Sequence, residues 1–311
     1  MKKITYINEF GLKIFLSKSI RRLFFKNYTW IGKKINLKNE NIIKKFLIEN
    51  IWNEAYKISL QPNPINKSIE INNTIWTMWW QGEKNAPDIV KVCIKKLRDE
   101  NKKVVVITKD NYLKYVTLEK EIVKKFKEEK ISFTHFSDII RVNLLFNYGG
   151  MWIDSTVLAT KKIQNSILKK EFYSIKTENY TNDPSHGRWT TFCMEAIQGS
   201  IIMKYLVNAF NIYFKKYNYM VDYILLDYFI LLAYESNNQV RLIIDNIPKN
   251  NSHVFDLRKY LNIPVKKCKY FKDTYLYKLS YKMNFNVNSK QQTLYQNLIL
   301  NIGNNTTNVK I

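Results

Sequence analysis

The stretch SDIIRVNLLFNYGGMWIDSTV, residues 137–157, joins two expected elements through a pair of adjacent glycines. Apolar side chains recur at helical spacing over residues 138–147, and residues 151–157 have the composition of a buried strand. Gly149 and Gly150 suit the junction, because glycine ends helices readily and adopts tight turns that other residues avoid. The stretch therefore predicts a helix–turn–strand unit, as found in α/β folds.

The same stretch carries three charged side chains. Asp138 and Arg141 are three positions apart on the expected helix, so their side chains are neighbours on one face. Asp154 falls near the end of the expected strand, and open α/β sheets bind ligands at the carboxyl ends of their strands. We therefore expect one pocket that contains all three side chains. Each has a structural alternative, with Asp138 as a helix N-cap, Arg141 as its partner and Asp154 as a cap or surface carboxylate.

Strands and helices alternate around this stretch. A short buried strand is expected at 74–80, a helix at 88–101 and a β-branched strand at 104–108. Helices are further expected at 41–58, 111–115, 118–128, 199–216 and 220–235, with a helical pair at 238–247 and 254–261 and closing strands at 270–282. The alternation predicts an α/β domain with a mainly parallel central sheet.

The size and composition of the chain allow one large domain with helical additions. It has 311 residues, of which 46% are hydrophobic, so a full core is expected rather than disorder. We divide it into a basic amphipathic helical segment at 1–68, an α/β domain at 69–300 and a polar tail at 301–311. A proline-punctuated linker is expected at 61–68. The three cysteines are far apart and form no CxxC pair, which argues against disulfides and zinc and fits a reducing cytosol.

The chain is strongly basic, with a formal net charge of +24. Such a charge favours a nucleic acid, an anionic membrane or a phosphorylated small molecule, although a lysine-rich bias without a target is the plain alternative. Residues 1–45 hold 12 Lys or Arg against 2 Glu. They predict a basic amphipathic helix that lies on an anionic membrane or packs on its own domain. Residues 1–16 are not expected to be a signal peptide, and no apolar run is long enough for a membrane span.

A longer pattern runs through the central stretch. It reads D-x-x-R-x-x-x-L-x-x-Y-G-G-x-W-x-D-x-T from Asp138 to Thr156. Further blocks flank it, with IWTMWWQG at 75–82, VDY and LDYF within 221–229, and YKLSYK at 277–282. In this order they resemble the capsular polysaccharide synthesis proteins, which are GT-A glycosyltransferases related to mannosyltransferases and glucosylating clostridial toxins. The resemblance spans residues 75–282.

The resemblance implies a GT-A-like nucleotide-sugar-binding domain with a mainly parallel sheet and helical additions at both ends. It implies transfer of a hexose-type sugar from a nucleotide-sugar donor, with retention of anomeric configuration. The acceptor would be a growing capsular or O-antigen-type polysaccharide or its lipid-linked precursor. Such an enzyme acts at the cytoplasmic face of the membrane, and no nucleic-acid partner is expected. From their charge and amphipathicity alone, residues 1–45 would keep it near that membrane surface.

The resemblance also implies roles for single residues. Trp79 lies where relatives stack an aromatic ring on the nucleotide base, with Trp76, Trp80 or a plain core role as alternatives. Asp138 and Arg141 lie where relatives bind the donor sugar, and Asp154 lies where they contact the ribose and the metal site. The candidate catalytic residues are Asp138, Arg141, Asp154 and Asp227. The candidate donor-binding residues are Trp79, Gln81, Gly149, Gly150, Asp154, Thr156, His186 and Lys278.

Thr156 stands where the family has the second aspartate of its D-x-D motif. A hydroxyl is a poorer ligand for Mg²⁺ or Mn²⁺ than a carboxylate, so a requirement for a divalent cation is in doubt. Asp154 and Asp227 are the candidate metal ligands, since an aspartate in the apolar run YILLDYFILL would be costly to bury unpaired. Lys278 or Lys282 could replace the cation instead.

Two other functions compete with the glycosyltransferase hypothesis. The substitution at Thr156 raises the possibility of a degenerate, inactive glycosyltransferase-like module. The basic charge and many aromatic residues raise a nucleic-acid-binding protein, but the sequence has no helix-turn-helix, RNA-recognition or zinc-finger signature. His186 belongs to the expected loop DPSHGRWTTF, which either closes over the donor or is a solvated turn.

Overall fold

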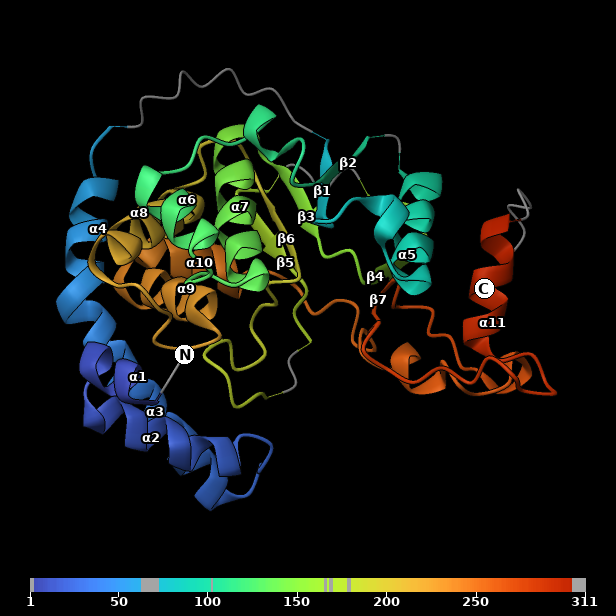
Figure 1. The fold of residues 1–311 in the computed structure, drawn as a ribbon, viewed down its shortest axis with the longest axis horizontal. Helices are drawn as coiled ribbons and strands as arrows, with labels where there is room; N and C mark the ends of the chain where they lie inside the picture. The colour runs from blue at the N-terminus through green and yellow to red at the C-terminus, as the bar shows by residue number, and fades with distance from the viewer. Residues whose placement is uncertain are drawn as a thin grey trace.

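The computed structural model describes residues 3–62, 73–101, 103–164, 167, 170–177 and 180–303. A five-stranded sheet runs through its middle, in the order β2-β1-β3-β6-β5 (Figure 1). The strands are β1 (Ile75–Met78), β2 (Val104–Ile107), β3 (Gly150–Ile153), β5 (Phe172–Ser174) and β6 (Cys193–Ala196). β1 pairs in parallel with β2 and β3, whereas β6 is antiparallel to β3 and β5. All strands except β6 thus run in one direction, which confirms a mixed α/β fold with a mainly parallel sheet.

A second, two-stranded sheet joins distant parts of the chain. β4 (Val157–Ala159) pairs antiparallel with β7 (Leu276–Lys278), and Val157 lies opposite Lys278. The link between the two sheets is the turn after β3, in which the Val157 amide donates to the Asp154 carbonyl at 2.9 Å. The chain therefore passes from one sheet to the other within a few residues of Asp154.

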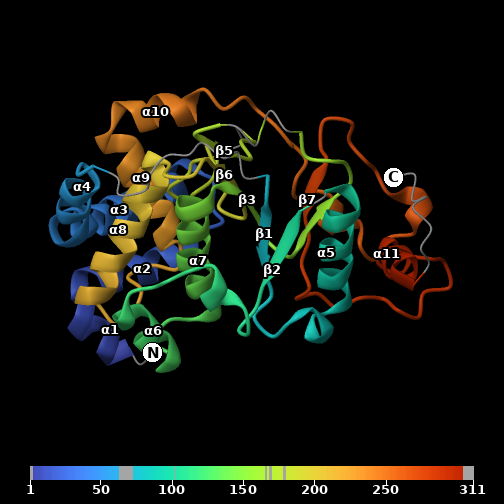
Figure 2. The same ribbon diagram turned by 90° about the horizontal axis from the view of Figure 1, so that it is seen from above.

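Helices cover both sides of the five-stranded sheet, as Figures 1 and 2 show. One side carries α4 (Asn53–Ser59), α6 (Lys120–Lys127), α7 (Phe133–Tyr148), α8 (Ile201–Lys216), α9 (Leu225–Ser236) and α10 (Asn238–Asp245). The other side carries α5 (Asp88–Glu100) and α11 (Leu294–Gly303), which contact each other. Short 3₁₀ turns lie at Glu83–Asn85, Tyr112–Lys114, Leu257–Tyr260 and Val265–Lys267.

The N-terminal helices pack on the rest of the chain. They are α1 (Lys3–Phe10), α2 (Leu12–Phe24) and α3 (Trp30–Leu47), and a π-helical turn at Ile48–Trp52 connects α3 to α4. Tyr6, Phe10 and Ile14 are buried in the same apolar core as the central strands. Burial of these side chains shows that one face of the segment packs on its own domain, and the expected contact with a membrane stays a prediction. No helix of the described residues is long and apolar enough to cross a membrane.

The expected and observed elements differ mainly at their ends. α7 begins before the expected 138, because Ser132 caps it by accepting a hydrogen bond from the His135 amide. The alternative reading of Asp138 as an N-cap is therefore wrong. The expected strand at 151–157 is two strands, β3 and β4, separated by the turn at 154–156.

Four further expectations are corrected. The expected helices at 111–115 and 254–261 are only 3₁₀ turns, and the helix expected from 220 begins at Leu225. The closing strands expected at 270–282 are the single strand β7. Residues 63–68 of the expected linker and 304–311 of the expected tail lie outside the described residues, so the proposed domain boundaries stay predictions.

Candidate functional site

The junction between α7 and β3 requires glycine at its first position. Gly149 has φ +67°, a left-handed conformation that favours glycine. A Cβ atom at Gly149 would lie 2.6 Å from the Gln198 amide nitrogen and 3.0 Å from the Ala196 carbonyl oxygen. Trp76 Nε1 also donates to the Gly149 carbonyl at 2.9 Å. The end of α7 therefore lies directly against the backbone after β6, and this contact fixes where β3 begins.

Four charged side chains meet where β3 ends. Arg141 Nη2 lies 3.3 Å from Asp138 Oδ1 and 3.1 Å from Asp154 Oδ1. Lys278 Nζ donates to Asp154 Oδ2 at 2.5 Å, and Trp152 Nε1 donates to Asp154 Oδ1 at 2.9 Å. We call Asp138, Arg141, Asp154 and Lys278 the charged cluster. The structure thus brings three of the four candidate catalytic residues into one network with Lys278, a further candidate donor-binding residue.

The charged cluster is held by backbone contacts around it. The Asp154 amide donates to the Phe192 carbonyl at 2.9 Å, and Lys278 Nζ lies 5.1 Å from the centroid of the Phe192 ring. Arg141 Nη1 donates to the Thr191 carbonyl, and the guanidinium lies 4.8 Å from the centroid of the Trp152 ring. The Arg141 side chain is only 5% exposed, whereas that of Asp154 is 27% exposed. The carboxylate is therefore accessible at the edge of a rigid, mostly buried guanidinium.

The two carboxyl groups beside Arg141 titrate at different pH. Burial alone would raise the pKa of Asp154, but the charges of Lys278 and Arg141 outweigh it and hold that pKa below its ordinary value. Burial raises the pKa of Asp138 to about 6, with the Arg141 charge opposing this shift and the Asp154 charge adding to it. At neutral pH Asp154 is an anion paired with two cations, and Asp138 changes its charge close to that pH.

Asp227 lies in the first turn of α9, near the charged cluster. Its Oδ1 accepts a hydrogen bond from Trp189 Nε1 at 3.0 Å. Burial raises the pKa of Asp227 to about 8, and the negative charges of Asp183 and Asp138 add to this effect. A carboxyl group that is neutral at pH 7 and accepts an indole N–H is well suited to this partly buried position. Within the described ranges, no hydrogen bond or ion pair joins Asp227 to Asp154.

Trp79 follows β1 directly, just as Asp154 follows β3. Because these strands are parallel neighbours, both residues leave the sheet at its carboxyl edge. Trp79 is half-buried, with its ring edge-on to Tyr281 at 5.3 Å between centroids. Trp76 is instead 3% exposed within β1. Trp80 packs among the rings of Tyr112, Phe126, Phe133 and Phe136. Of the three tryptophans, Trp79 therefore fits a ligand contact best.

Two buried N–H groups near this edge have no protein acceptor. Trp79 Nε1 and Arg141 Nε are both buried and without a hydrogen-bond partner among the residues that the structure describes. Unpaired buried donors cost free energy, so such groups in a folded protein call for an explanation. Neither atom is exposed, so each would need a shift of its side chain before it could donate to a ligand at the carboxyl edge.

The other candidate donor-binding residues lie outside the charged cluster. Gly149 and Gly150 lie at the amino end of β3, about 13 Å of strand away from Asp154. His186 Nε2 contacts Glu40 of α3 at 3.1 Å, which joins the 183–189 loop to the N-terminal helices. The Thr156 carbonyl accepts from the Leu279 amide at 2.8 Å, and Gln81 is exposed in the turn after β1. The observed contacts of the two glycines, His186 and the Thr156 backbone are therefore contacts within the fold, and their predicted roles in donor binding stay predictions.

The charged cluster does not fit a divalent cation well in this arrangement. Each oxygen of Asp154 already contacts an N–H donor, and the Lys278 ammonium lies where a cation would contact Oδ2. The parts of the chain that the structure describes contain no group of three or more His, Cys, Asp or Glu able to hold a metal ion. The assignment of a metal to Asp154 and Asp227 therefore stays a prediction without support from the geometry.

Sequence reasoning left out three residues of this site. Trp152 and Asp154 are two positions apart, and the period of a strand places such side chains on one face, so Trp152 could have been found. Thr191 and Phe192 contribute backbone carbonyls, which carry no residue-specific signal, and the Phe192 ring reaches Lys278 only through the fold. They could not have been found without the fold.

Open α/β sheets bind ligands at the carboxyl ends of their parallel strands. The charged cluster lies at that edge, so the fold and the site together define a ligand-binding α/β protein. The chain matches the family model described as capsular polysaccharide synthesis protein over residues 24–298. It belongs to this family, which confirms the resemblance found in the sequence. Membership links the chain to capsular polysaccharide synthesis and indicates a biosynthetic enzyme. A search of curated proteins gave no match.

Proposed function

We propose that this protein is a GT-A-like glycosyltransferase that uses a nucleotide-sugar donor. It would extend a capsular or O-antigen-type polysaccharide, or its lipid-linked precursor, with retention of anomeric configuration. Family membership supports a role in capsule synthesis, and the observation that carries the proposal is the contact of Asp154 with Arg141 and Lys278 at the carboxyl edge.

The charged cluster supplies what the departure of a nucleoside diphosphate needs. Negative charge grows on the leaving diphosphate, and fixed cations stabilise it best where water is excluded. An ammonium has three N–H donors, and Lys278 uses one of them on Asp154. We assign the diphosphate to Lys278 and Arg141 rather than to a divalent cation, because Asp154 already holds both side chains in place.

The remaining groups suit the sugar and the nucleoside. The Asp154 carboxylate can accept hydrogen bonds from ribose hydroxyls, and Asp138 can accept them from the transferred sugar. Trp79, half-buried at the carboxyl edge, offers an aromatic face on which the nucleotide base can stack. Asp227 is close enough to Asp138 for the Asp138 charge to raise its pKa, so it would lie beside the transferred sugar.

Calorimetric binding to UDP-, GDP-, CMP- and ADP-sugars tests the proposal. Each titration is run with Mn²⁺, with Mg²⁺ and with a chelator. We expect one nucleotide class to bind, and to bind with chelator present. Asp154→Asn should weaken this binding about tenfold or more, while Asp99→Asn, a control at an exposed position of α5, should not change it.

Two results would oppose the proposal. Absence of binding to every nucleotide sugar by the folded protein would favour an inactive glycosyltransferase-like module, which the presence of Thr156 already motivates. Binding without release of nucleoside diphosphate in the presence of acceptor extracts from capsule-forming cells would support the same alternative. Binding that requires Mn²⁺ or Mg²⁺ would keep the enzyme but overturn the role given to Lys278.

A further inference from the structure

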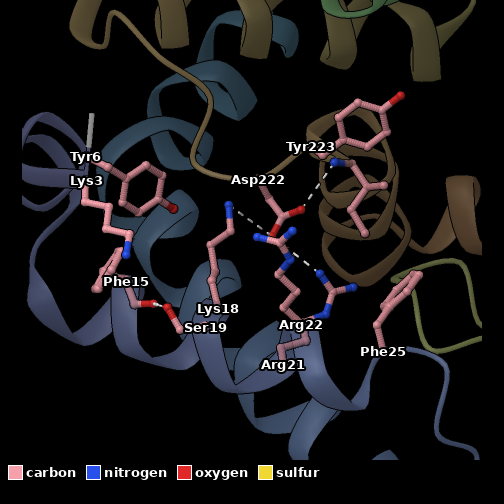
Figure 3. A pocket seen from close by; sticks show the side chains of 11 residues that line it. Lys3, Tyr6, Phe15, Lys18, Ser19, Arg21, Arg22, Phe25, Asp222 and Tyr223 are labelled. Carbon is pink, nitrogen blue, oxygen red and sulfur yellow. Dashed lines mark hydrogen bonds and ion pairs between the residues drawn. The ribbon is translucent and has the colours of Figure 1, made fainter. Parts of the chain in front are cut away.

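A cavity of about 500 Å³ lies between the N-terminal helices and the segment that leads into α9 (Figure 3). Lys18, Arg21 and Arg22 of α2 line one wall, and Asp222, Tyr223 and Ile224 line the other. Figure 3 shows the Lys18 and Arg21 side chains converging on Asp222. We call this cavity the basic pocket. It is separate from the charged cluster at Asp154.

The charge of the basic pocket is positive. Lys3, Lys18, Arg21 and Arg22 outnumber Asp222, which is the only carboxylate among the described residues that line the pocket. Asp222 Oδ2 lies 3.6 Å from Lys18 Nζ and 3.5 Å from Arg21 Nη1. Lys3 and Arg22 form no hydrogen bond or ion pair with any residue that the structure describes, and both cations are therefore free for an anion.

The outer face of α2 is apolar although it is exposed. Leu12 is 56% exposed, Leu16 49%, Ile20 51% and Leu23 81%. At 3.6 residues per turn, these four side chains fall within roughly 80° of the helix circumference. Ile14 and Arg21, on the opposite side, are buried against the protein. We call the four exposed residues the apolar stripe; on the helix it lies beside the pocket residues Ser19 and Arg22.

Further exposed aromatic side chains follow α2. Phe25 is 38% exposed, Tyr28 55% and Trp30 73%, and all three lie in or next to the connection to α3. Lys34 lies 4.9 Å from the centroid of the Trp30 ring. Tyrosine and tryptophan are enriched where a protein meets the membrane interface, because their rings are apolar and their tips are polar.

We propose that α2 lies in the interface of a membrane that contains anionic phospholipids, with the apolar stripe against the acyl chains and a lipid phosphate in the basic pocket. A bilayer of this kind offers an apolar layer directly beneath a layer of phosphates, which matches a row of leucines beside free cations. Nucleic acid offers the phosphates alone and would leave the apolar stripe in water. A 13-residue helix is about 20 Å long and can lie in the plane of the interface.

The basic pocket is connected to the charged cluster through the fold. Arg21 Nη2 donates to the Asn182 carbonyl at 3.2 Å, in the segment that leads to Trp189 and its contact with Asp227. The far wall of the pocket, Asp222–Ile224, directly precedes α9, which carries Asp227 in its first turn. A membrane bound at α2 would thus hold the candidate site near the surface where lipid-linked acceptors are displayed. Only this last consequence rests on the proposed function.

Flotation of the full-length chain with liposomes tests the membrane proposal without any sugar donor. Vesicles of phosphatidylcholine alone are compared with vesicles that also contain phosphatidylglycerol. We expect binding to the anionic vesicles at least tenfold stronger than to the neutral ones. The double variant Leu16→Ser/Leu23→Ser should bind the anionic vesicles at least tenfold more weakly than the unchanged chain. Arg22→Gln should bind them more weakly by about threefold or more.

The matched controls are exposed residues of the same types elsewhere. Leu113 and Leu242 are 70% and 63% exposed, so Leu113→Ser/Leu242→Ser should bind vesicles as the unchanged chain does. Arg258 is exposed in the turn at Leu257–Tyr260, so Arg258→Gln should also bind normally. Thermal melting of each variant confirms that it is folded.

Several outcomes would overturn the proposal. An equal loss of vesicle binding in the control variants and the α2 variants would show that a basic protein adsorbs nonspecifically. Stabilisation by inorganic phosphate without any vesicle binding would make the basic pocket a site for free phosphate. A dimer by light scattering that Leu16→Ser/Leu23→Ser dissociates would show that the apolar stripe binds a second copy of the chain. Because no donor is present, none of these results bears on glycosyl transfer.

Discussion

The ammonium of Lys278 contacts the carboxylate of Asp154 at 2.5 Å, although the two residues are 124 positions apart in the chain. The contact exists because β4 and β7 pair in a register that places Lys278 opposite Val157, just after the turn that contains Asp154. A cation supplied by a distant strand therefore completes a cluster whose other members lie within one helix–turn–strand unit.

Removal of the Lys278 charge should weaken donor binding. We expect Lys278→Met to lower the affinity for the nucleotide sugar about tenfold or more, since charge-assisted hydrogen bonds to phosphate are among the strongest polar contacts. Calorimetry measures this effect, and Lys272→Met, at an exposed position of the same region, is the control. Unchanged affinity in Lys278→Met would remove Lys278 from the proposed site.

Asp138 should give the enzyme a pH dependence near pH 6. Burial raises the pKa of Asp138 to about 6, so its carboxyl group is neutral below this pH and ionised above it. If the anion binds sugar hydroxyls, kcat/KM should rise with pH through about 6 and then level off. Asp138→Asn should lower kcat/KM and remove this rise. A rise that persists in Asp138→Asn would assign the titration to another group.

Asp227 should make the protein less stable as pH rises. The pKa of Asp227 is about 8 in the folded protein against 3.8 as its ordinary value, so the folded state binds the proton more tightly. The stability that this proton contributes is present below about pH 4 and is lost as pH rises toward 8. Asp227→Asn has no such titration and can still accept the Trp189 N–H.

Urea unfolding at two pH values measures this effect. The gain in free energy of unfolding from Asp227→Asn should be larger at pH 8.5 than at pH 5 by more than about 1 kcal/mol. Asp99→Asn, at an exposed position, should show a much smaller difference. A gain that is the same at both pH values would mean that Asp227 ionises normally.

Gly149 should tolerate no side chain. Gly149→Ala combines a positive φ with a Cβ atom placed 2.6 Å from the Gln198 amide nitrogen, and we expect it to cost about 3 kcal/mol or to prevent folding. Gly82 has φ +84° and ψ 150°, a conformation almost exclusive to glycine, but it has open space around it. Gly82→Ala should therefore cost only the backbone strain, about 1–2 kcal/mol, and less than Gly149→Ala. Similar melting temperatures for the two variants would contradict the close contact at Gly149.

The local part of the candidate site could be predicted from sequence. Asp138 and Arg141 were expected to meet because side chains three apart on a helix are neighbours, and Asp154 was expected to join them at the end of a strand. The structure confirms this arrangement, including the glycine junction. Their roles in catalysis stay predictions.

The long-range contacts could not be predicted from local patterns. Lys278 was only one of two lysines suggested as a cation, because the register of β4 against β7 depends on the whole fold. His186 was expected near the donor or in solvent, yet it contacts Glu40 of α3, which lies 146 positions away. The apolar spacing of residues 138–147 also concealed the start of α7, since the capping Ser132 lies outside that range.

The position of β7 late in the sequence has a consequence for protein synthesis. Domains form progressively as a chain leaves the ribosome, N-terminal parts first. The Asp138–Arg141–Asp154 network can therefore assemble in a nascent chain well before Lys278 has been translated. Until the last tenth or so of the chain emerges, the carboxylate of Asp154 lacks its second cation. Under the proposed function, incomplete translation products that end before Lys278 should thus be unable to transfer a sugar, whatever else they have folded.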